Sequence, residues 1–219
     1  MTSPSLEPAD ASASDDAMVL VVDDDAGLRR ALGNLFRSVG LKVALFASAA
    51  ELLATPFPDT PCCLLLDVRL RGPSGLDLQS RLGRMGIDIP IIFMTGYGDI
   101  AMTVAAMKAG AEDFMPKPFR DQDLLDAVAA ALEKDRLRRA GLRQGEALRA
   151  CYQSLTPRES EVMGLAVAGL LNKQIAAEIG ISEVTVKIHR GQAMRKMKAR
   201  TFAELVLMAQ QLGICKVGG

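Results

Sequence analysis

Short apolar runs alternate with helix-like segments over the first 133 residues of the chain. The apolar runs predict strands at 18–23, 42–46, 62–66, 90–94 and 113–116. Apolar positions at helical spacing predict helices between them, at 26–38, 48–54, 75–84, 99–109 and 121–133. Glycines at 40, 86 and 110 stand where three of these helices should end. Five strand–helix units in succession indicate an α/β fold with a five-stranded, doubly wound parallel sheet.

The pattern becomes purely helical after residue 154. Thr156, Pro157 and Glu159 have the spacing of a helix start with a capping box. We expect a helix from there to about Gly169, and three more at 173–178 (capped by Asn172), 183 to about 200 (capped by Ser182) and 202–211. A short helix, a glycine turn and a longer helix with basic residues are typical of a helix-turn-helix.

Composition divides the chain further. Residues 1–17 consist mostly of Ser, Ala, Pro and Asp and predict a disordered tail. Residues 134–154, rich in Arg, Leu, Ala and Glu, predict a helical linker that extends the fifth helix. The net charge of zero conceals −8 over residues 1–133 (11 Lys and Arg, 19 Asp and Glu) and +8 over 134–219 (15 and 7). The two parts are therefore expected to do different jobs, one of which involves a polyanion.

Several classes of protein are excluded. No apolar run approaches the roughly 20 residues of a membrane span, and the acidic start does not resemble a secretory signal. The four cysteines, Cys62, Cys63, Cys151 and Cys215, include no CxxC pair, so we expect reduced thiols in a cytoplasmic protein rather than a zinc site.

Polar residues close four of the predicted strands. Asp23 and Asp24 follow the first apolar run, Asp67 the third, Thr95 the fourth and Lys117 the fifth. The carboxyl ends of strands in an open parallel sheet share one edge, where ligands bind. Carboxylates at such an edge suit Mg²⁺, which prefers oxygen ligands. We therefore expect a pocket for a divalent cation and a phosphoryl group.

Most of these residues also have a purely structural interpretation. One of the acids at 23–25 is expected to cap the following helix. Lys117 could be an ordinary loop lysine, Thr95 could simply end a strand, and Phe114 could be a core residue. Asp67 is harder to explain in this way, because a carboxylate that ends a buried strand needs a partner.

Both parts of the chain resemble known protein families. Residues 18–133 resemble the flavodoxin-like receiver domain of bacterial two-component response regulators, through Val21-Val22-Asp23-Asp24-Asp25, Leu66-Asp67-Val68-Arg69-Leu70, Met94-Thr95-Gly96-Tyr97-Gly98 and Lys117-Pro118-Phe119. The segment 98–111 looks most like the FixJ branch. Residues 155–214 resemble the LuxR-type (NarL-like) helix-turn-helix, through the stretches 155–159, 172–176 and 185–187.

The resemblance implies a role for each residue of the pocket. Asp67 would accept a phosphoryl group from a sensor histidine kinase, and Lys117 would neutralise the phosphoryl oxygens. Mg²⁺ would be held by Asp67 together with three further groups: Asp23, Asp24 and the backbone carbonyl of Arg69. These assignments agree with phosphoryl transfer in general, in which a protein mostly positions groups and neutralises charge.

The resemblance also implies a switch and a dimer. Thr95 would move towards the phosphoryl group, and Phe114 would follow as the aromatic switch residue, acting by packing alone because it has no hydroxyl. In the resembled family this change favours a homodimer.

The helix after Ser182 has two different faces. Its apolar stripe, expected to face the domain core, consists of Val186, His189, Ala193 and Met197. The opposite face, expected in the DNA major groove, carries Val184, Lys187, Ile188, Gly191 and Arg195. Lys187 is the best candidate for a base edge, and Ile188 for a thymine methyl group. Phosphate contacts are expected from Lys173, Thr185 and Arg190. Lys196 either stabilises the helix end or contacts the DNA backbone.

Taken together, these features predict a phosphorylation-dependent transcriptional regulator that is not an enzyme. Its expected partners are promoter DNA and a cognate sensor histidine kinase, with RNA polymerase as a further candidate. Two other classes stay open. In one, the receiver is a docking or phosphate-sink module and the basic domain binds protein or RNA. In the other, Asp67 is the nucleophile of a metal-dependent phosphatase, for which the short loops leave little room.

Overall fold

The computed structural model describes residues 17–72, 74–96, 104, 107–108 and 110–214. The chain divides into two compact units, Met1–Arg139 and Ala140–Gly219, which are described separately. Most of the predicted helix at 99–109, and the predicted tail except for Ala17, lie outside the described residues.

The first unit is built on a five-stranded parallel sheet. Its strands are β1 (Met18–Val22), β2 (Lys42–Phe46), β3 (Cys62–Asp67), β4 (Ile91–Thr95) and β5 (Asp113–Pro116). They lie in the order β2-β1-β3-β4-β5, and every neighbouring pair is parallel. This is the doubly wound sheet that the sequence predicts. The order in which successive strands are added to the sheet reverses between β1 and β3, and ligands bind at such a switch point in these folds.

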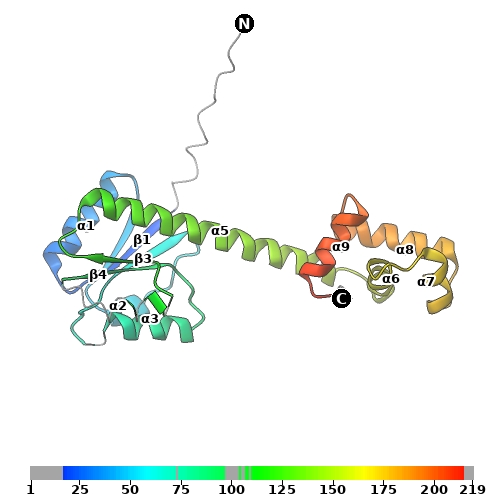
Figure 1. Cartoon of the computed structure of the whole chain (residues 1–219), viewed down its shortest axis with the longest axis horizontal. Helices are drawn as coiled ribbons and strands as arrows, with labels where there is room; N and C mark the ends of the chain where they lie inside the picture. The colour runs from blue at the N-terminus through cyan, green and yellow to red at the C-terminus, as the bar shows by residue number, and fades with distance from the viewer. Residues whose placement is uncertain (1–16, 73, 97–103, 105–106, 109, 215–219) are drawn as a thin grey trace, which may run out of the picture. The chain divides into compact units, whose positions relative to one another are not determined.

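Helices cover both faces of the sheet (Figure 1). Helices α1 (Ala26–Ser38) and α5 (Asp121–Gln153) pack on one face, and α2 (Ala49–Leu53) and α3 (Gly75–Arg84) on the other. Strand β3 is buried along its whole length because its side chains alternate between the two cores. The predicted polar edge of the sheet is therefore supported by apolar layers on both sides.

The helix ends follow the local sequence signals. Asp25 is the N-cap of α1, with its Oδ1 accepting hydrogen bonds from two backbone N–H groups at 2.7 and 3.0 Å. Of the three consecutive acids, Asp25 is thus the one that caps the helix. Gly40 and Gly86, just past α1 and α3, have φ angles of +81° and +71°, a left-handed conformation that favours glycine.

Helix α5 continues through the predicted linker as far as Gln153, one residue short of its predicted end. A buried carboxylate, Asp135, ties it to the sheet. Its Oδ2 accepts a hydrogen bond from the Cys62 backbone N–H at 2.9 Å, at the start of β3. Arg138 donates to Oδ1 at 2.9 and 2.6 Å, and Arg139 donates to Oδ2 at 2.6 Å. Burial raises the pKa of Asp135, but the bonds from Cys62 and the two arginines outweigh burial and hold it below its ordinary value.

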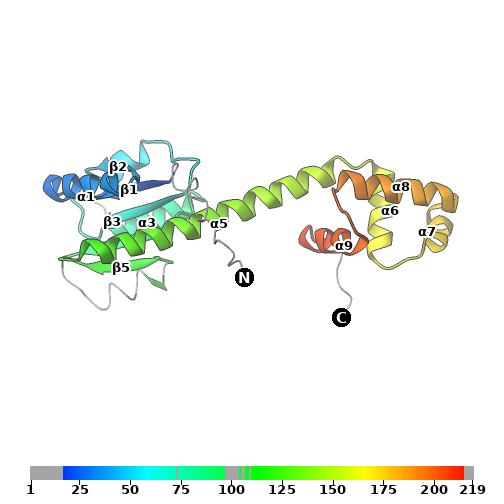
Figure 2. The same ribbon diagram turned by 90° about the horizontal axis from the view of Figure 1, so that it is seen from above.

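The second unit is a group of helices (Figure 2). They are α6 (Pro157–Val167), α7 (Asn172–Ile179), α8 (Glu183–Lys196) and α9 (Phe202–Gln211). Thr156 and Ser182 cap α6 and α8 as predicted. The predicted cap at Asn172 is wrong, because Asn172 is already helical and its side chain accepts a hydrogen bond from Arg190 instead. Helix α8 also ends earlier than predicted, at Lys196.

Three cysteines, Cys62, Cys63 and Cys151, are free thiols, and Cys215 lies outside the described residues. Across the part of the chain that the structure describes, no helix is both long enough and apolar enough to cross a membrane.

We predict that Asp135→Asn destabilises the first unit. The change keeps the side-chain shape but removes the charge that two arginines and a buried backbone N–H engage. The free energy of unfolding at neutral pH should fall by about 3 kcal/mol. Urea unfolding followed by circular dichroism measures it. Asp126→Asn, exposed on the same helix, is the matched control and should change stability by less than about 0.5 kcal/mol.

The difference in unfolding free energy between the wild-type protein and Asp135→Asn should change with pH in one direction. Because the folded-state pKa of Asp135 lies below the ordinary value of 3.8, its stabilisation is complete above that value and is lost as pH falls through the folded-state pKa. The gap between the wild-type protein and Asp135→Asn should therefore narrow in acid. A gap that widened below pH ~4 would contradict the assignment.

Candidate functional site

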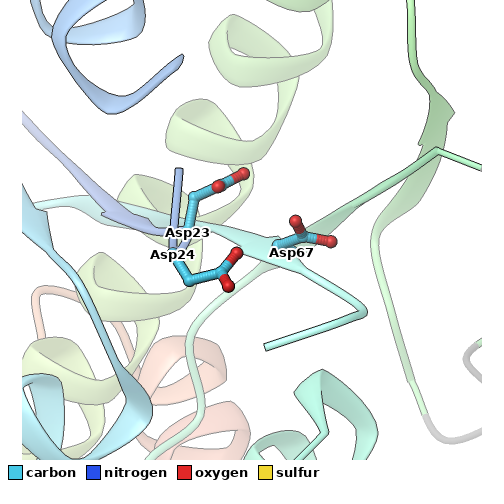
Figure 3. A group of neighbouring side chains, drawn as sticks. All are labelled: Asp23, Asp24 and Asp67. Carbon is cyan, nitrogen blue, oxygen red and sulfur yellow. The ribbon is translucent and has the colours of Figure 1, made fainter. Parts of the chain in front are cut away.

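Three carboxylates gather where β1 and β3 end. Asp23 and Asp24 directly follow β1, and Asp67 is the last residue of the adjacent strand β3 (Figure 3). One ligand atom from each of the three lies within 4.8 Å of the others. Asp23 is fully buried, Asp67 is 8% exposed, and Asp24 is half-buried. The structure thus brings together the three acids that the sequence places at strand ends.

Lys117 bridges two of these carboxylates. Its Nζ donates to Oδ2 of Asp23 at 2.7 Å and to Oδ2 of Asp67 at 2.9 Å. Its backbone N–H donates to the carbonyl of Thr95 at 2.6 Å, which ties the segment after β5 to the end of β4. Lys117 is therefore part of the carboxylate cluster and not an ordinary loop lysine.

Burial and pairing act in opposite directions on these charges. Burial raises the pKa of Asp23 above its ordinary value, although hydrogen bonds from Lys117 and the Asp25 backbone oppose it. Burial lowers the pKa of Lys117, but its hydrogen bonds to Asp23 and Asp67 outweigh burial and leave it above its ordinary value. The lysine therefore carries its charge throughout the physiological pH range.

Two further contacts involve Asp67 and Asp24. The Arg69 backbone N–H donates to Asp67 Oδ1 at 3.0 Å, so the Arg69 backbone lies beside the acid. Arg71 Nε donates to Asp24 Oδ2 at 2.8 Å. Arg71 could not be predicted from the sequence, because nothing in the local pattern distinguishes it from any other loop arginine.

The two residues predicted to form a switch lie on neighbouring strands. Thr95 is buried at the end of β4. Phe114, on β5, is half-buried, and its ring centroid lies 6.4 Å from that of Phe93. It packs against the core on the α2–α3 side of the sheet. The geometry fits a core residue, and the switch role of both residues stays a prediction.

Gly75 lets helix α3 approach the end of β3. A Cβ atom at this position would lie 2.6 Å from the backbone oxygen of Asp67, and 3.1 and 3.2 Å from Phe93 and Leu66. Its backbone N–H donates to the carbonyl of Val68 at 3.0 Å. The position therefore requires a residue without a side chain, and no local sequence signal marks this requirement.

The cluster has the chemistry of a site for a divalent cation. Its ligand atoms are carboxylate oxygens, and Mg²⁺ usually takes one or two carboxylates while keeping several waters. Among the residues that the structure describes, two cations, Lys117 and Arg71, form ion pairs with these three carboxylates, which leaves an excess of negative charge among the paired groups. A hard divalent cation matches both the oxygen donors and the excess charge.

Helix α8 of the second unit has the two faces that its sequence predicts. On the inner face Val186, Ala193 and Met197 are buried, and His189 is half-buried. On the outer face Lys187, Gly191 and Arg195 are exposed, while Val184 and Ile188 are 66% and 53% exposed. Exposed apolar side chains beside a lysine and an arginine form a surface suited to a DNA groove.

Two basic residues of α8 are engaged within the unit instead. The guanidinium of Arg190 lies 4.1 Å from the ring centre of Phe202, and its Nη1 donates to Asn172 Oδ1 at 3.1 Å. Lys196 Nζ donates to Glu159 Oε2 at 2.5 Å and to the Ser154 carbonyl at 3.2 Å. The sequence predicted that Lys196 would stabilise the helix end or contact the DNA backbone, and it did not indicate this contact with Glu159.

The two remaining candidates for phosphate contacts differ. Lys173 is exposed at the start of α7. Thr185 is half-buried, and its hydroxyl pairs with that of Ser182 at 2.8 Å. Of these two residues, only Lys173 is exposed.

Two known families match the chain, one in each unit. Residues 19–129 match the family described as the response regulator receiver domain, and residues 153–209 match the one described as bacterial regulatory proteins of the luxR family.

Similar proteins and structures cover both units. Nodulation protein W of Bradyrhizobium diazoefficiens is 58% identical over 92% of this chain and 89% of its own length. The response regulator protein TodT of Pseudomonas putida is 46% identical over 90% of this chain and 86% of its own. Among solved structures, the response regulator StyR has a TM-score of 0.83 at 46% identity, covering 90% of this chain and 99% of its own.

We predict that Gly75→Ala destabilises the first unit by about 1–3 kcal/mol, because the added methyl group would collide with backbone and packed side chains. Gly83→Ala on the same helix is the control, since a Cβ there would meet nothing within 4 Å. That change should stabilise the protein by about 0.4–1 kcal/mol. Urea unfolding of both variants compares them, and equal effects would argue against the tight approach at Gly75.

Proposed function

This chain belongs to the two-component response regulators that join a receiver domain to a LuxR-type DNA-binding domain, and we propose that Asp67 is the residue on which it accepts the phosphoryl group. The chain is accordingly a transcriptional regulator. The observation that carries the assignment is Lys117, which bonds both Asp23 and Asp67 at the β1–β3 switch point. The proposed parts of the chain are a receiver at 18–133, a helical linker at 134–154 and a DNA-binding domain at 155–214.

The chemistry of the receiver is transfer of one phosphoryl group. A carboxylate oxygen of Asp67 attacks the phosphorus of a phosphohistidine on the sensor kinase. The new P–O bond forms as the P–N bond breaks, and the electron pair of that bond returns to the imidazole. Lys117 then lies beside the new phosphoryl oxygens and offsets their charge. The contacts of Lys117 with Asp67 support this position.

Mg²⁺ is the proposed cofactor. The groups that would hold it are the carboxylates of Asp23, Asp24 and Asp67 and the backbone carbonyl of Arg69. When bound, the ion supplies neutralisation of the carboxylates and of the transferred phosphoryl oxygens. The fit of the carboxylate cluster to a hard divalent cation supports the assignment.

The proposed output begins at Thr95 and Phe114. A phosphoryl group on Asp67 adds nearly two negative charges and three acceptor oxygens. The Thr95 hydroxyl would move to donate to one of them, and Phe114 would repack behind it. The buried position of Thr95 on β4, next to the strand that carries Asp67, supports this order of events.

The proposed DNA contacts lie on the outer face of α8. Lys187 would read a base edge and Ile188 a thymine methyl group, flanked by Gly191 and Arg195. Lys173 and Thr185 would contact phosphates. Nη1 of Arg190 already donates a hydrogen bond to Asn172, so Arg190 would contact a phosphate with its other N–H groups.

The proposed assembly is a homodimer formed on phosphorylation, which would bind two half-sites of promoter DNA. The cognate partner upstream is a sensor histidine kinase, and RNA polymerase is a proposed partner at the promoter. Because its proposed partners are promoter DNA and a kinase phosphohistidine, its proposed compartment is the cytoplasm.

We expect Asp67→Asn to abolish phosphorylation. Intact-mass analysis after incubation with acetyl phosphate and Mg²⁺ should show one phosphoryl adduct on the wild-type protein and none on the variant. Asp25→Asn alters the neighbouring helix cap and leaves the three clustered carboxylates intact, so this control should still accept one phosphoryl group. Equal adduct formation on Asp67→Asn would place the acceptor elsewhere.

Lys187→Ala and Lys173→Ala should weaken DNA binding in different ways. Losing a base contact at Lys187 should lower specific affinity by about 1–3 kcal/mol and relax the preference at one base position. Losing a phosphate contact at Lys173 should weaken all sequences alike and flatten the salt dependence. The measurement is selection from a random DNA pool, followed by titrations of selected and scrambled sites at two salt concentrations. Identical behaviour of both variants would disprove the assignment of the recognition face.

A further inference from the structure

Arg71 holds the most accessible acid of the cluster. Its Nε lies 2.8 Å from Asp24 Oδ2, and the side chains of Arg71 and Asp24 are 90% and 25% exposed. Lys117 forms ion pairs with the other two acids, Asp23 and Asp67. The three carboxylates are therefore paired with two cations of different exposure, a partly buried lysine and an almost fully exposed arginine.

A guanidinium and a divalent cation are in competition for Asp24. Both are attracted by the same negative charge, and they repel each other when both lie beside one carboxylate. Mg²⁺ also demands a nearly octahedral set of oxygen ligands, which leaves little freedom to share them. Arg71 can yield at low cost, because an exposed ion pair contributes little stability and its side chain already extends into water.

We propose that Arg71 is a competing cation that occupies Asp24 until a divalent metal ion binds, and that it thereby weakens the metal affinity of the site. This inference rests on the proposed metal-dependent function of the cluster. Arg71 acts through Asp24 and is a positioning residue, because it contacts neither the reacting carboxylate nor the lysine. The receiver then binds its metal ion more weakly than its three carboxylates alone would allow.

If Arg71 instead strengthened metal binding, its removal would lower the metal affinity of the site. Asp24 Oδ1 has no hydrogen-bond partner among the described contacts, so Arg71 on Oδ2 could instead orient the carboxylate towards the metal ion. A ligand-orienting arginine strengthens metal binding, as partners of metal ligands generally do. The direction of change on removing Arg71 therefore separates the two roles.

The test is a calorimetric titration of Mg²⁺ into the full-length protein at low ionic strength. Arg71→Gln shortens the side chain but keeps it polar and removes its charge, so the affinity of this variant for Mg²⁺ should rise by about two- to fivefold. Arg71→Lys keeps the charge and should stay closer to the wild-type protein. Arg81→Gln on helix α3 removes an exposed charge that is not paired with any of the three carboxylates, and it should change the affinity by less than about 1.5-fold.

Salt and thermal unfolding give independent readouts. At high ionic strength the affinities of the wild-type protein and Arg71→Gln should converge, because screening weakens the exposed pair. In EDTA, where the pair is intact, Arg71→Gln should unfold at a lower temperature than the wild-type protein. In saturating Mg²⁺ the two unfolding temperatures should coincide.

Two results would overturn the inference, and they are distinguishable from failure of the proposed function. Equal or weaker Mg²⁺ binding by Arg71→Gln, with normal binding by the wild-type protein, rejects competition and leaves the metal site standing. An equal rise in affinity for Arg81→Gln also rejects it, in favour of general charge effects. If the wild-type protein binds no Mg²⁺ at all, both the inference and the proposed metal site are wrong.

Discussion

Repulsion among three carboxylates is the constraint on which the architecture of the first unit depends. Asp23, Asp24 and Asp67 offer ligand atoms within 4.8 Å of one another, and such a group is stable only beside compensating cations. Lys117, which follows the fifth strand, supplies one by bonding two of the acids at once. The order of strands that puts β1 next to β3, and the glycine that admits α3 at position 75, both lead to this one small volume.

The features that could be predicted from the sequence are those with a local signature. Apolar runs ended by polar residues located the strands to within about one residue, and Thr156 and Ser182 located helix starts. The roles of Arg71, Asp135 and Gly75 could not be predicted in this way. Each role depends on contacts with residues that are distant in the sequence and become neighbours only in the folded protein. Neither residue spacing nor helix and strand propensity indicates such contacts. The prediction that Asn172 caps helix α7 is wrong for a related reason. Its side chain accepts a hydrogen bond from Arg190, which is distant in the sequence.

The charge of the second unit also has a structural component that a count of basic residues hides. Arg190 is stacked on an aromatic ring, and Lys196 is paired with a capping glutamate. These contacts within the unit engage two of the 15 basic residues of segment 134–219. Lys187 and Arg195 stay exposed on the outer face of the helix. Fewer basic side chains are therefore available to a polyanion than the composition suggests, and Lys187 and Arg195 place two of them on one helix face.

Strand β3 is held at both ends by side chains from distant segments. Its first backbone N–H bonds Asp135, its last side chain bonds Lys117, and β1 and β4 flank it on either side. Peptide N–H groups in such a strand can exchange hydrogen for deuterium only when the whole unit opens. The slowest-exchanging amides of β3 therefore report global opening, whereas those in the segment that carries Arg71 report local motion. One exchange experiment can separate a change at the metal-binding edge from a change in the stability of the entire domain.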